Sequence, residues 1–245
     1  MNILEVKNLS KQYRSFKLDN VTFSIEEGSI TGFLGVNGAG KTTTIKSILG
    51  QIIPDSGEIS LFGEVVNLKN ETKLKNKIGI VYDDSPFYGH LTLKEMTSIV
   101  APAFKKWDKK IYKETLHEFH LKDNTVINEL SKGMKMKYSI ALALSHHAKL
   151  LIMDEPTGGL DPIVRRDFSR ILENLRENRI TTLYSTHITS DLENIADHLM
   201  IINKGKIITN NTVKNLKAKE NKDSTIEEIL VNSIKEDNDA NNVSG

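Results

Sequence analysis

The sequence contains no cysteine, no excess of either charge and no long apolar run. The absence of cysteine excludes disulfides and thiolate chemistry and agrees with a reducing compartment. Lys and Arg number 33 against 32 Asp and Glu, so no basic field favours a nucleic acid partner. No apolar stretch approaches the roughly 18 residues of a transmembrane helix. We therefore expect a soluble chain, for which any membrane role would need a second, spanning protein.

What is present is a phosphate-binding loop. Residues 35–42 read Gly-Val-Asn-Gly-Ala-Gly-Lys-Thr and match G-x-x-x-x-G-K-[ST] at every fixed position. A buried strand is expected just before the loop and a helix just after it, and the amides at the start of that helix attract anions. Lys41 can bridge the β- and γ-phosphates, and the Thr42 hydroxyl can bind Mg²⁺. We expect a nucleoside triphosphate to be held by Asn37, Gly38, Ala39, Gly40, Lys41, Thr42 and Thr43.

An apolar strand that ends in two acidic residues supplies the second half of a site. Leu150 to Met153 is followed by Asp154 and Glu155. In phosphate-loop enzymes a carboxylate at such a strand end holds Mg²⁺, which is the role expected of Asp154. Glu155 can orient or deprotonate the water that attacks the γ-phosphate. The loop alone leaves kinases, GTPases and transport ATPases open, and the Asp-Glu pair narrows that choice.

The order of the expected elements predicts an α/β fold. Apolar strand patterns at residues 149–153, 181–185 and 199–202 alternate with helical stretches, which is typical of a largely parallel sheet. Residues 84–145 have a mostly helical character and are predicted to form an inserted subdomain. Thr92 and Glu95 form a capping box at the start of one of its helices. We expect one domain over residues 1–235 and a disordered tail, rich in Asp, Asn and Ser, over 236–245.

Together these motifs resemble the ATP-binding subunit of an ATP-binding-cassette (ABC) transporter, over roughly residues 3–215. Residues 130–134, Leu-Ser-Lys-Gly-Met, stand where the family has its LSGGQ signature, and residues 158–161, Gly-Gly-Leu-Asp, resemble its D-loop. His187 matches the switch histidine, and Tyr13 matches the aromatic that stacks on adenine. The resemblance implies a P-loop NTPase fold with a mainly parallel sheet core, an N-terminal antiparallel β subdomain and an inserted α-helical subdomain.

The resemblance also implies a mechanism. Two subunits would dimerise head to tail on Mg-ATP, with Ser131 and Gly133 contacting the γ-phosphate bound to the other subunit. His187 would contact the γ-phosphate within its own subunit and act in catalysis with Glu155 and Lys41. Asp161 would help to connect the two sites. ATP and Mg²⁺ are the expected cofactors, and Thr42, Asp83 and Asp154 are the expected metal ligands.

Three positions depart from the family pattern. Lys132 replaces the first glycine of the signature, whose glutamine is replaced by Met134. Asp83 stands where the family usually has the glutamine that senses Mg²⁺ and the γ-phosphate. A carboxylate can still take a metal-bound water, but it repels the triphosphate where an amide would not. We expect Asp83 to keep the sensing role.

Within the family the chain is most similar to the exporter branch of Gram-positive bacteria, which handles antimicrobial peptides, antibiotics or toxin-like peptides such as phenol-soluble modulins. The expected partners are an integral membrane permease and either a second copy or another ABC ATPase, with no nucleic acid. The expected location is cytoplasmic, on the inner face of the membrane. Two alternatives stay open at this point: a soluble single-cassette ATPase of an assembly system, and a non-transport regulator that uses ATP only to dimerise.

Several further residues give weaker signals. Phe87 and Tyr88 lie in an apolar loop and are predicted to face a partner. His117 and His120 have a spacing that can hold a metal, but a solvated helix face is the better interpretation. His146 and His147 are expected on the surface. Residues 203–206, Asn-Lys-Gly-Lys, are predicted to form a hairpin turn.

Overall fold

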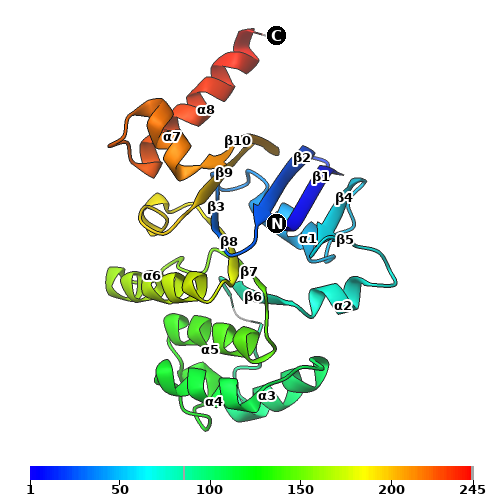
Figure 1. Ribbon diagram of the computed structural model, residues 1–245, viewed down its shortest axis with the longest axis vertical. Coiled ribbons are helices and arrows are strands. Elements are labelled where there is room, and N and C mark those ends of the chain that lie inside the picture. The colour runs from blue at the N-terminus through cyan, green and yellow to red at the C-terminus, as the bar shows by residue number, and fades with distance from the viewer. Residues whose placement is uncertain (85, 244–245) are drawn as a thin grey trace.

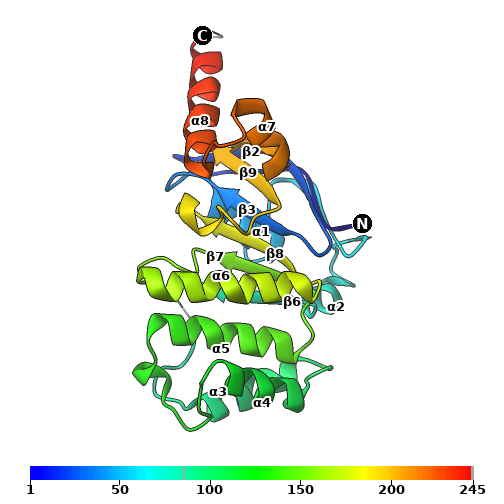
Figure 2. The ribbon, with the colours of Figure 1, turned by 60° about the vertical axis from the view of Figure 1, so that its left-hand side comes forward.

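The structure is a computed structural model that describes residues 1–84 and 86–243. These residues form a central six-stranded sheet, a smaller four-stranded sheet beside it, and helices around both (Figure 1). The helices α3, α4 and α5 lie together at one end of the molecule, and α5 is the one nearest the sheet (Figure 2). The α-helices are α1 (Lys41–Ile48), α2 (Glu71–Lys75), α3 (Leu93–Val100), α4 (Lys109–Glu118), α5 (Lys132–Ser145), α6 (Pro162–Glu177), α7 (Val213–Glu220) and α8 (Ile226–Val243), with 3₁₀ turns at Ala101–Ala103, Ile127–Glu129 and Thr189–Asp191 (η3).

The six-stranded sheet gathers the functional loops at one edge. Its order is β10 (Lys206–Thr212), β9 (His198–Asn203), β3 (Ile30–Leu34), β8 (Thr181–Thr186), β7 (Leu150–Asp154) and β6 (Ile78–Tyr82), parallel except for β10. In register, Asp154 pairs with both Tyr82 and Ser185, and Leu34 pairs with Thr186. The loops after β3, β6, β7 and β8 therefore leave the sheet side by side, at the edge where parallel α/β sheets bind ligands.

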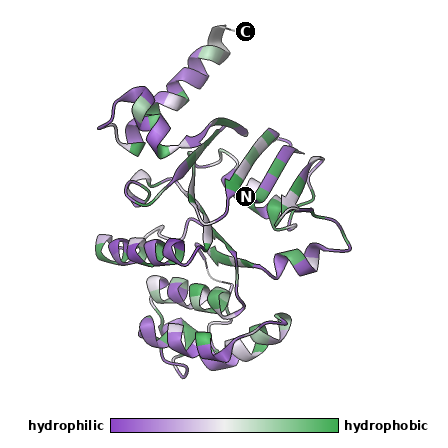
Figure 3. Cartoon of the chain, in the orientation of Figure 1, coloured by the Kyte–Doolittle hydropathy of each residue, from purple (hydrophilic) through white to green (hydrophobic). Residues whose placement is uncertain are grey.

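The second sheet is antiparallel, in the order β2 (Lys17–Glu26), β1 (Asn2–Gln12), β4 (Ser56–Leu61) and β5 (Glu64–Val65). Buried and exposed residues alternate along β2, and Figure 3 shows this alternation of hydropathy. All five residues of β3 and of β7 are buried, as expected for parallel strands covered on both faces. The predicted parallel core, antiparallel N-terminal sheet and helical insertion are confirmed.

The helical insertion consists of α3, α4 and α5. The capping box is present: the Glu95 amide donates to the Thr92 hydroxyl at 3.2 Å, and the Thr92 amide donates to the Glu95 carboxylate at 2.8 Å. Phe87 packs against this subdomain, its ring 5.0 Å from that of Tyr138. Phe87 is thus partly buried against the core of the subdomain, whereas Tyr88 is 58% exposed, and the partner-facing role stays a prediction for both.

His146 also differs from the sequence prediction. It follows the last residue of α5 and is 5% exposed, whereas the side chain of His147 is about half exposed. The His146 imidazole stacks on the Phe104 ring with centroids 3.9 Å apart and planes 7° apart. Burial lowers its pKa to about 4. The predicted surface position of His146 is wrong because Phe104, 42 residues earlier in the chain, covers the imidazole ring.

The C-terminal part differs too. The hairpin at Lys204 and Gly205 joins β9 to β10 as predicted. Beyond it α8 runs to Val243, so residues 236–243 are helical where disorder was expected. This helix is tied to the hairpin: the Asn203 amide group donates to Asp237 at 2.7 Å, and Lys204 donates to Asn238 at 2.9 Å. Such contacts between distant residues offset the weak helix propensity of Asp and Asn. The tail residues 244–245 lie outside the described residues.

Across residues 1–84 and 86–243, no helix combines the length and the hydropathy that crossing a bilayer requires.

Candidate nucleotide site

The phosphate loop connects β3 to α1. Gly40 caps α1 with φ 119°, a conformation that residues with a side chain rarely adopt, and it provides no side-chain cap. The first amides of α1 are therefore free of a side-chain acceptor and point toward the loop, which is the arrangement that binds phosphate. A cavity of about 610 Å³ lies against this helix end.

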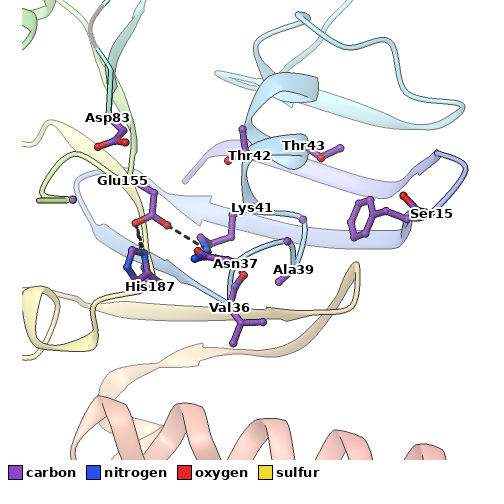
Figure 4. Close-up of a pocket in the computed structure, with 14 residues that line it drawn as sticks. Ser15, Val36, Asn37, Ala39, Lys41, Thr42, Thr43, Asp83, Glu155 and His187 are labelled. Carbon is purple, nitrogen blue, oxygen red and sulfur yellow. Dashed lines mark hydrogen bonds and ion pairs between the residues drawn. The ribbon is translucent and has the colours of Figure 1, made fainter.

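Ten of the predicted site residues line that cavity (Figure 4). They come from the phosphate loop and from the loops after β6, β7 and β8: Asn37, Gly38, Ala39, Gly40, Lys41, Thr42, Thr43, Asp83, Glu155 and His187. Ser15, Phe16, Val36 and Gly158 complete the lining. The strand order of the sheet explains this convergence, because all four loops leave the same edge.

Lys41, Glu155 and His187 form a continuous chain of contacts (Figure 4). Lys41 is 6% exposed, and its ammonium donates to the Gly35 carbonyl at 2.7 Å and lies 3.2 Å from Glu155 Oε1. The other oxygen of Glu155 lies 2.8 Å from His187 Nδ1. Glu155 has φ 52°, in the left-handed region, at the point where β7 ends. This backbone conformation is costly for a residue with a side chain, and it is typical of functional sites.

Asp154 is the last residue of β7 and contacts Thr42, which lines the cavity. It is 9% exposed, and its Oδ1 accepts a hydrogen bond from the Thr42 hydroxyl at 3.5 Å. Burial raises the pKa of Asp154, and the hydrogen bond from Thr42 acts in the opposite direction. A hydroxyl and a carboxylate side by side are the hard oxygen ligands that Mg²⁺ prefers. The residues present therefore fit a magnesium ion at Thr42 and Asp154.

Ser131, Gly133 and Asp161 lie outside the cavity, at the starts of two helices. Ser131 caps α5 and accepts from the Met134 amide at 3.3 Å, and Asp161 caps α6 and accepts from two amides at 3.0 Å. The two helix starts are in contact, since a methyl group on Gly133 would come within 2.8 Å of Val164. One chain does not bring these residues to its own phosphate loop.

Comparison with known proteins identifies the family. The family model described as "ABC transporter" matches residues 18–158, more than half of the chain. The chain belongs to the ABC transporter family. It is 39% identical to the bacitracin transport ATP-binding protein BcrA of Bacillus licheniformis, over 90% of this chain and 73% of BcrA. It is 33% identical to the lantibiotic transport ATP-binding protein SrtF of Streptococcus pyogenes, over 84% of this chain and 89% of SrtF.

The fold is shared with solved ABC subunits. A structure described as the ATP-binding subunit of an ABC transporter superposes with a TM-score of 0.84 at 29% identity, covering 95% of this chain and 99% of that one. The P-loop NTPase fold is thereby confirmed, and the chain is an ABC transporter ATP-binding subunit. Members of this family bind and hydrolyse ATP, and the cavity beside the phosphate loop is the candidate site for it.

In this ABC subunit the aromatic that lines the cavity is not Tyr13, the residue expected to stack on adenine. Phe16 is part of the lining, whereas Tyr13 is not, and Tyr13 is 38% exposed. The two rings lie in one loop with centroids 6.4 Å apart, and the Tyr13 amide donates to the Phe16 carbonyl at 2.7 Å. Tyr13 was predicted from the family resemblance alone. For Phe16, the only signal in the sequence was that it lies close to Tyr13 in the chain.

A buried polar cluster of Thr157, Tyr184 and Asp191 was also missed. Tyr184, on β8, donates its hydroxyl to Asp191 in η3 at 2.8 Å and lies 2.8 Å from the Thr157 hydroxyl, which also bonds to Asp191. Thr157 is two residues after Glu155, and Asp191 is four residues after His187. The cluster thus ties together the two loops that carry the catalytic candidates.

Proposed function

We propose that this ABC subunit powers the export of a peptide, antibiotic or toxin through a separate membrane permease. The family establishes an ATP-binding transporter subunit, which implies a permease partner. The support for export is that relatives across most of the chain are named for bacitracin and lantibiotic transport. We assign residues 1–235 to one ATPase domain, with its helical subdomain at 84–145, located on the cytoplasmic face of the membrane.

The contact between Lys41, Glu155 and His187 carries the catalytic part of the proposal. Lys41 holds the β- and γ-phosphates and draws negative charge from the γ-phosphate as it is transferred. Glu155 accepts a proton from the attacking water, and His187, at 2.8 Å, holds that carboxylate in place. Thr42 and Asp154 would hold Mg²⁺, which neutralises charge between the β- and γ-phosphates when it is bound.

The signature residues support a dimer. Ser131, Gly133 and Asp161 lie away from the chain's own cavity, at the N-termini of α5 and α6. We propose that they face the ATP of a second subunit in a head-to-tail dimer, where Ser131 and the amides of α5 contact its γ-phosphate. The second subunit is either another copy of this chain or a different ABC ATPase.

The proposal is tested with Glu155→Gln, which keeps the shape of the side chain and removes its basicity. Hydrolysis of Mg-ATP should fall about 10²- to 10⁴-fold, the usual contribution of a general base, while ATP binding is retained. Glu177→Gln makes the same change at an exposed position of α6 and should leave turnover unchanged. Equal turnover in the Glu155→Gln protein would remove Glu155 from the catalytic role.

The same variant tests the partner. Tagged Glu155→Gln protein with Mg-ATP is used to capture partners from detergent-solubilised native membranes, and mass spectrometry identifies them. Recovery of a multi-span membrane protein supports the transport role, and a second ABC ATPase in the sample indicates a heterodimer. Recovery of ribosomal or assembly proteins alone would contradict export while leaving the ATPase assignment in place.

A further inference from the structure

Lys132 occupies an electrostatically unfavourable place. It is the first residue of α5, where the helix dipole is positive, and the first turn of α5 has no acidic residue. Its ammonium group reaches away from the helix and contacts two oxygens, Asp83 Oδ1 and the backbone carbonyl of Gly158. The contact joins three segments: the start of the signature helix, the loop after β6 and the loop after β7.

Both partners of Lys132 line the ATP cavity. Figure 4 shows Asp83 near Glu155, on the side of the cavity opposite Ser15. Two carboxylates in a triphosphate site repel the ligand unless cations offset them. Glu155 is offset by Lys41, at 3.2 Å, and Asp83 is offset by Lys132. Each acidic side chain that lines the cavity thus has its own lysine.

Gly158 adds an independent indication that the carboxylate is accommodated here. A methyl group on Gly158 would come within 3.0 Å of Asp83 Oδ1, closer than most real contacts of this kind. The glycine therefore leaves room for the carboxylate while its carbonyl accepts from Lys132. Asp83 and Lys132 also occupy two positions at which this sequence departs from the family pattern, and the fold brings them together although they are 49 residues apart.

We propose that Lys132 is a positioning residue for Asp83, holding its carboxylate at the edge of the ATP cavity and offsetting its charge. The two residues act as one neutral unit, so that an acidic group can stand beside the triphosphate without weakening its binding. This inference rests on the proposed ATP site, to which it assigns one further residue.

The test is a double-mutant cycle in the full-length chain, with the dissociation constant of Mg-ATP measured by calorimetry. Lys132→Met alone leaves Asp83 uncompensated and should weaken binding about fivefold, the upper end expected for a solvent-accessible ion pair. In an Asp83→Asn background the same change should alter binding by less than about twofold, since no charge is left to offset. Lys132→Arg keeps the positive charge and should therefore bind Mg-ATP with wild-type affinity.

Lys135→Met is the matched control, because it removes the same charge one turn further along α5. It should change binding by less than about twofold, which separates the specific pair from the general field of the helix. Equal weakening by Lys132→Met in the wild-type and Asp83→Asn backgrounds would overturn the inference and place Lys132 directly on the nucleotide. No effect in either background would overturn it as well. A wild-type chain that binds no Mg-ATP would instead refute the ATP site itself.

Discussion

Acid should destabilise this subunit through one buried imidazole. His146 is 5% exposed and stacked on Phe104, and burial lowers its pKa to about 4. In the unfolded chain the pKa of a histidine is near 6.5. Between these two values the unfolded chain binds a proton that the folded chain excludes. The contribution of His146 to the free energy of unfolding is therefore fully present above about pH 6.5 and is lost as the pH falls toward 4.

The size of the effect follows from the width of this window. Each pH unit within it changes the free energy of unfolding by about 1.4 kcal/mol. Lowering the pH from about 7 to about 5 crosses about one and a half units of the window, so His146 alone should cost about 2 kcal/mol. That is a large fraction of the roughly 5–15 kcal/mol that stabilises a typical domain.

The measurement is urea unfolding of the wild type, His146→Phe and His147→Phe at both pH values. Phe keeps an aromatic ring to stack on Phe104 and cannot titrate, so His146→Phe should lose about 2 kcal/mol less than the wild type between about pH 7 and about pH 5. His147→Phe replaces a half-exposed imidazole next to it and serves as the control. An identical loss of stability in the wild type and His146→Phe would refute the assignment.

Three further predictions concern the ATP cavity, the start of α5 and the buried polar cluster. Phe16→Ala should weaken Mg-ATP binding by about 1–3 kcal/mol, the range for a base stacked on an aromatic ring, and Tyr13→Ala should weaken it less; calorimetry showing the reverse order would favour Tyr13. Gly133→Ala should lower stability by about 1–3 kcal/mol through overpacking against Val164, and Val164→Ala should restore it in urea unfolding. Tyr184→Phe should cost about 1–3 kcal/mol of stability and lower the kcat of ATP hydrolysis more than it changes KM, and an unchanged kcat would confine the buried hydroxyl to a structural role.

Much of the ATP site could be predicted from the sequence because its main part is local. The strand, the glycine loop and the helix that make the phosphate site are consecutive in the chain, so their geometry depends on neighbouring residues alone. The capping box at Thr92 and the turn at Lys204 and Gly205 were predictable for the same reason. Asp154 and Glu155 stood out because an apolar strand that ends in acidic residues is also a local pattern.

Contacts between distant segments were beyond the sequence patterns. Nothing in the periodicity of residues 226–243 indicated the partners on the β9–β10 hairpin that accompany α8. The choice of Phe16 over Tyr13 as the ring in the cavity depends on how one loop folds over the phosphate site. The ring that covers His146 comes from another part of the helical insertion.

The sequence by itself determined that this chain binds phosphate, that a strand end carries Asp154 and Glu155, and that the core is a parallel α/β sheet. Only the tertiary structure decided that Glu155 stands between Lys41 and His187, and that Lys132 pairs with Asp83. The reason is physical. Hydrophobic periodicity and turn chemistry act between neighbours in the chain, whereas the partner of a charged side chain is set by which strand ends and helix starts the fold brings together.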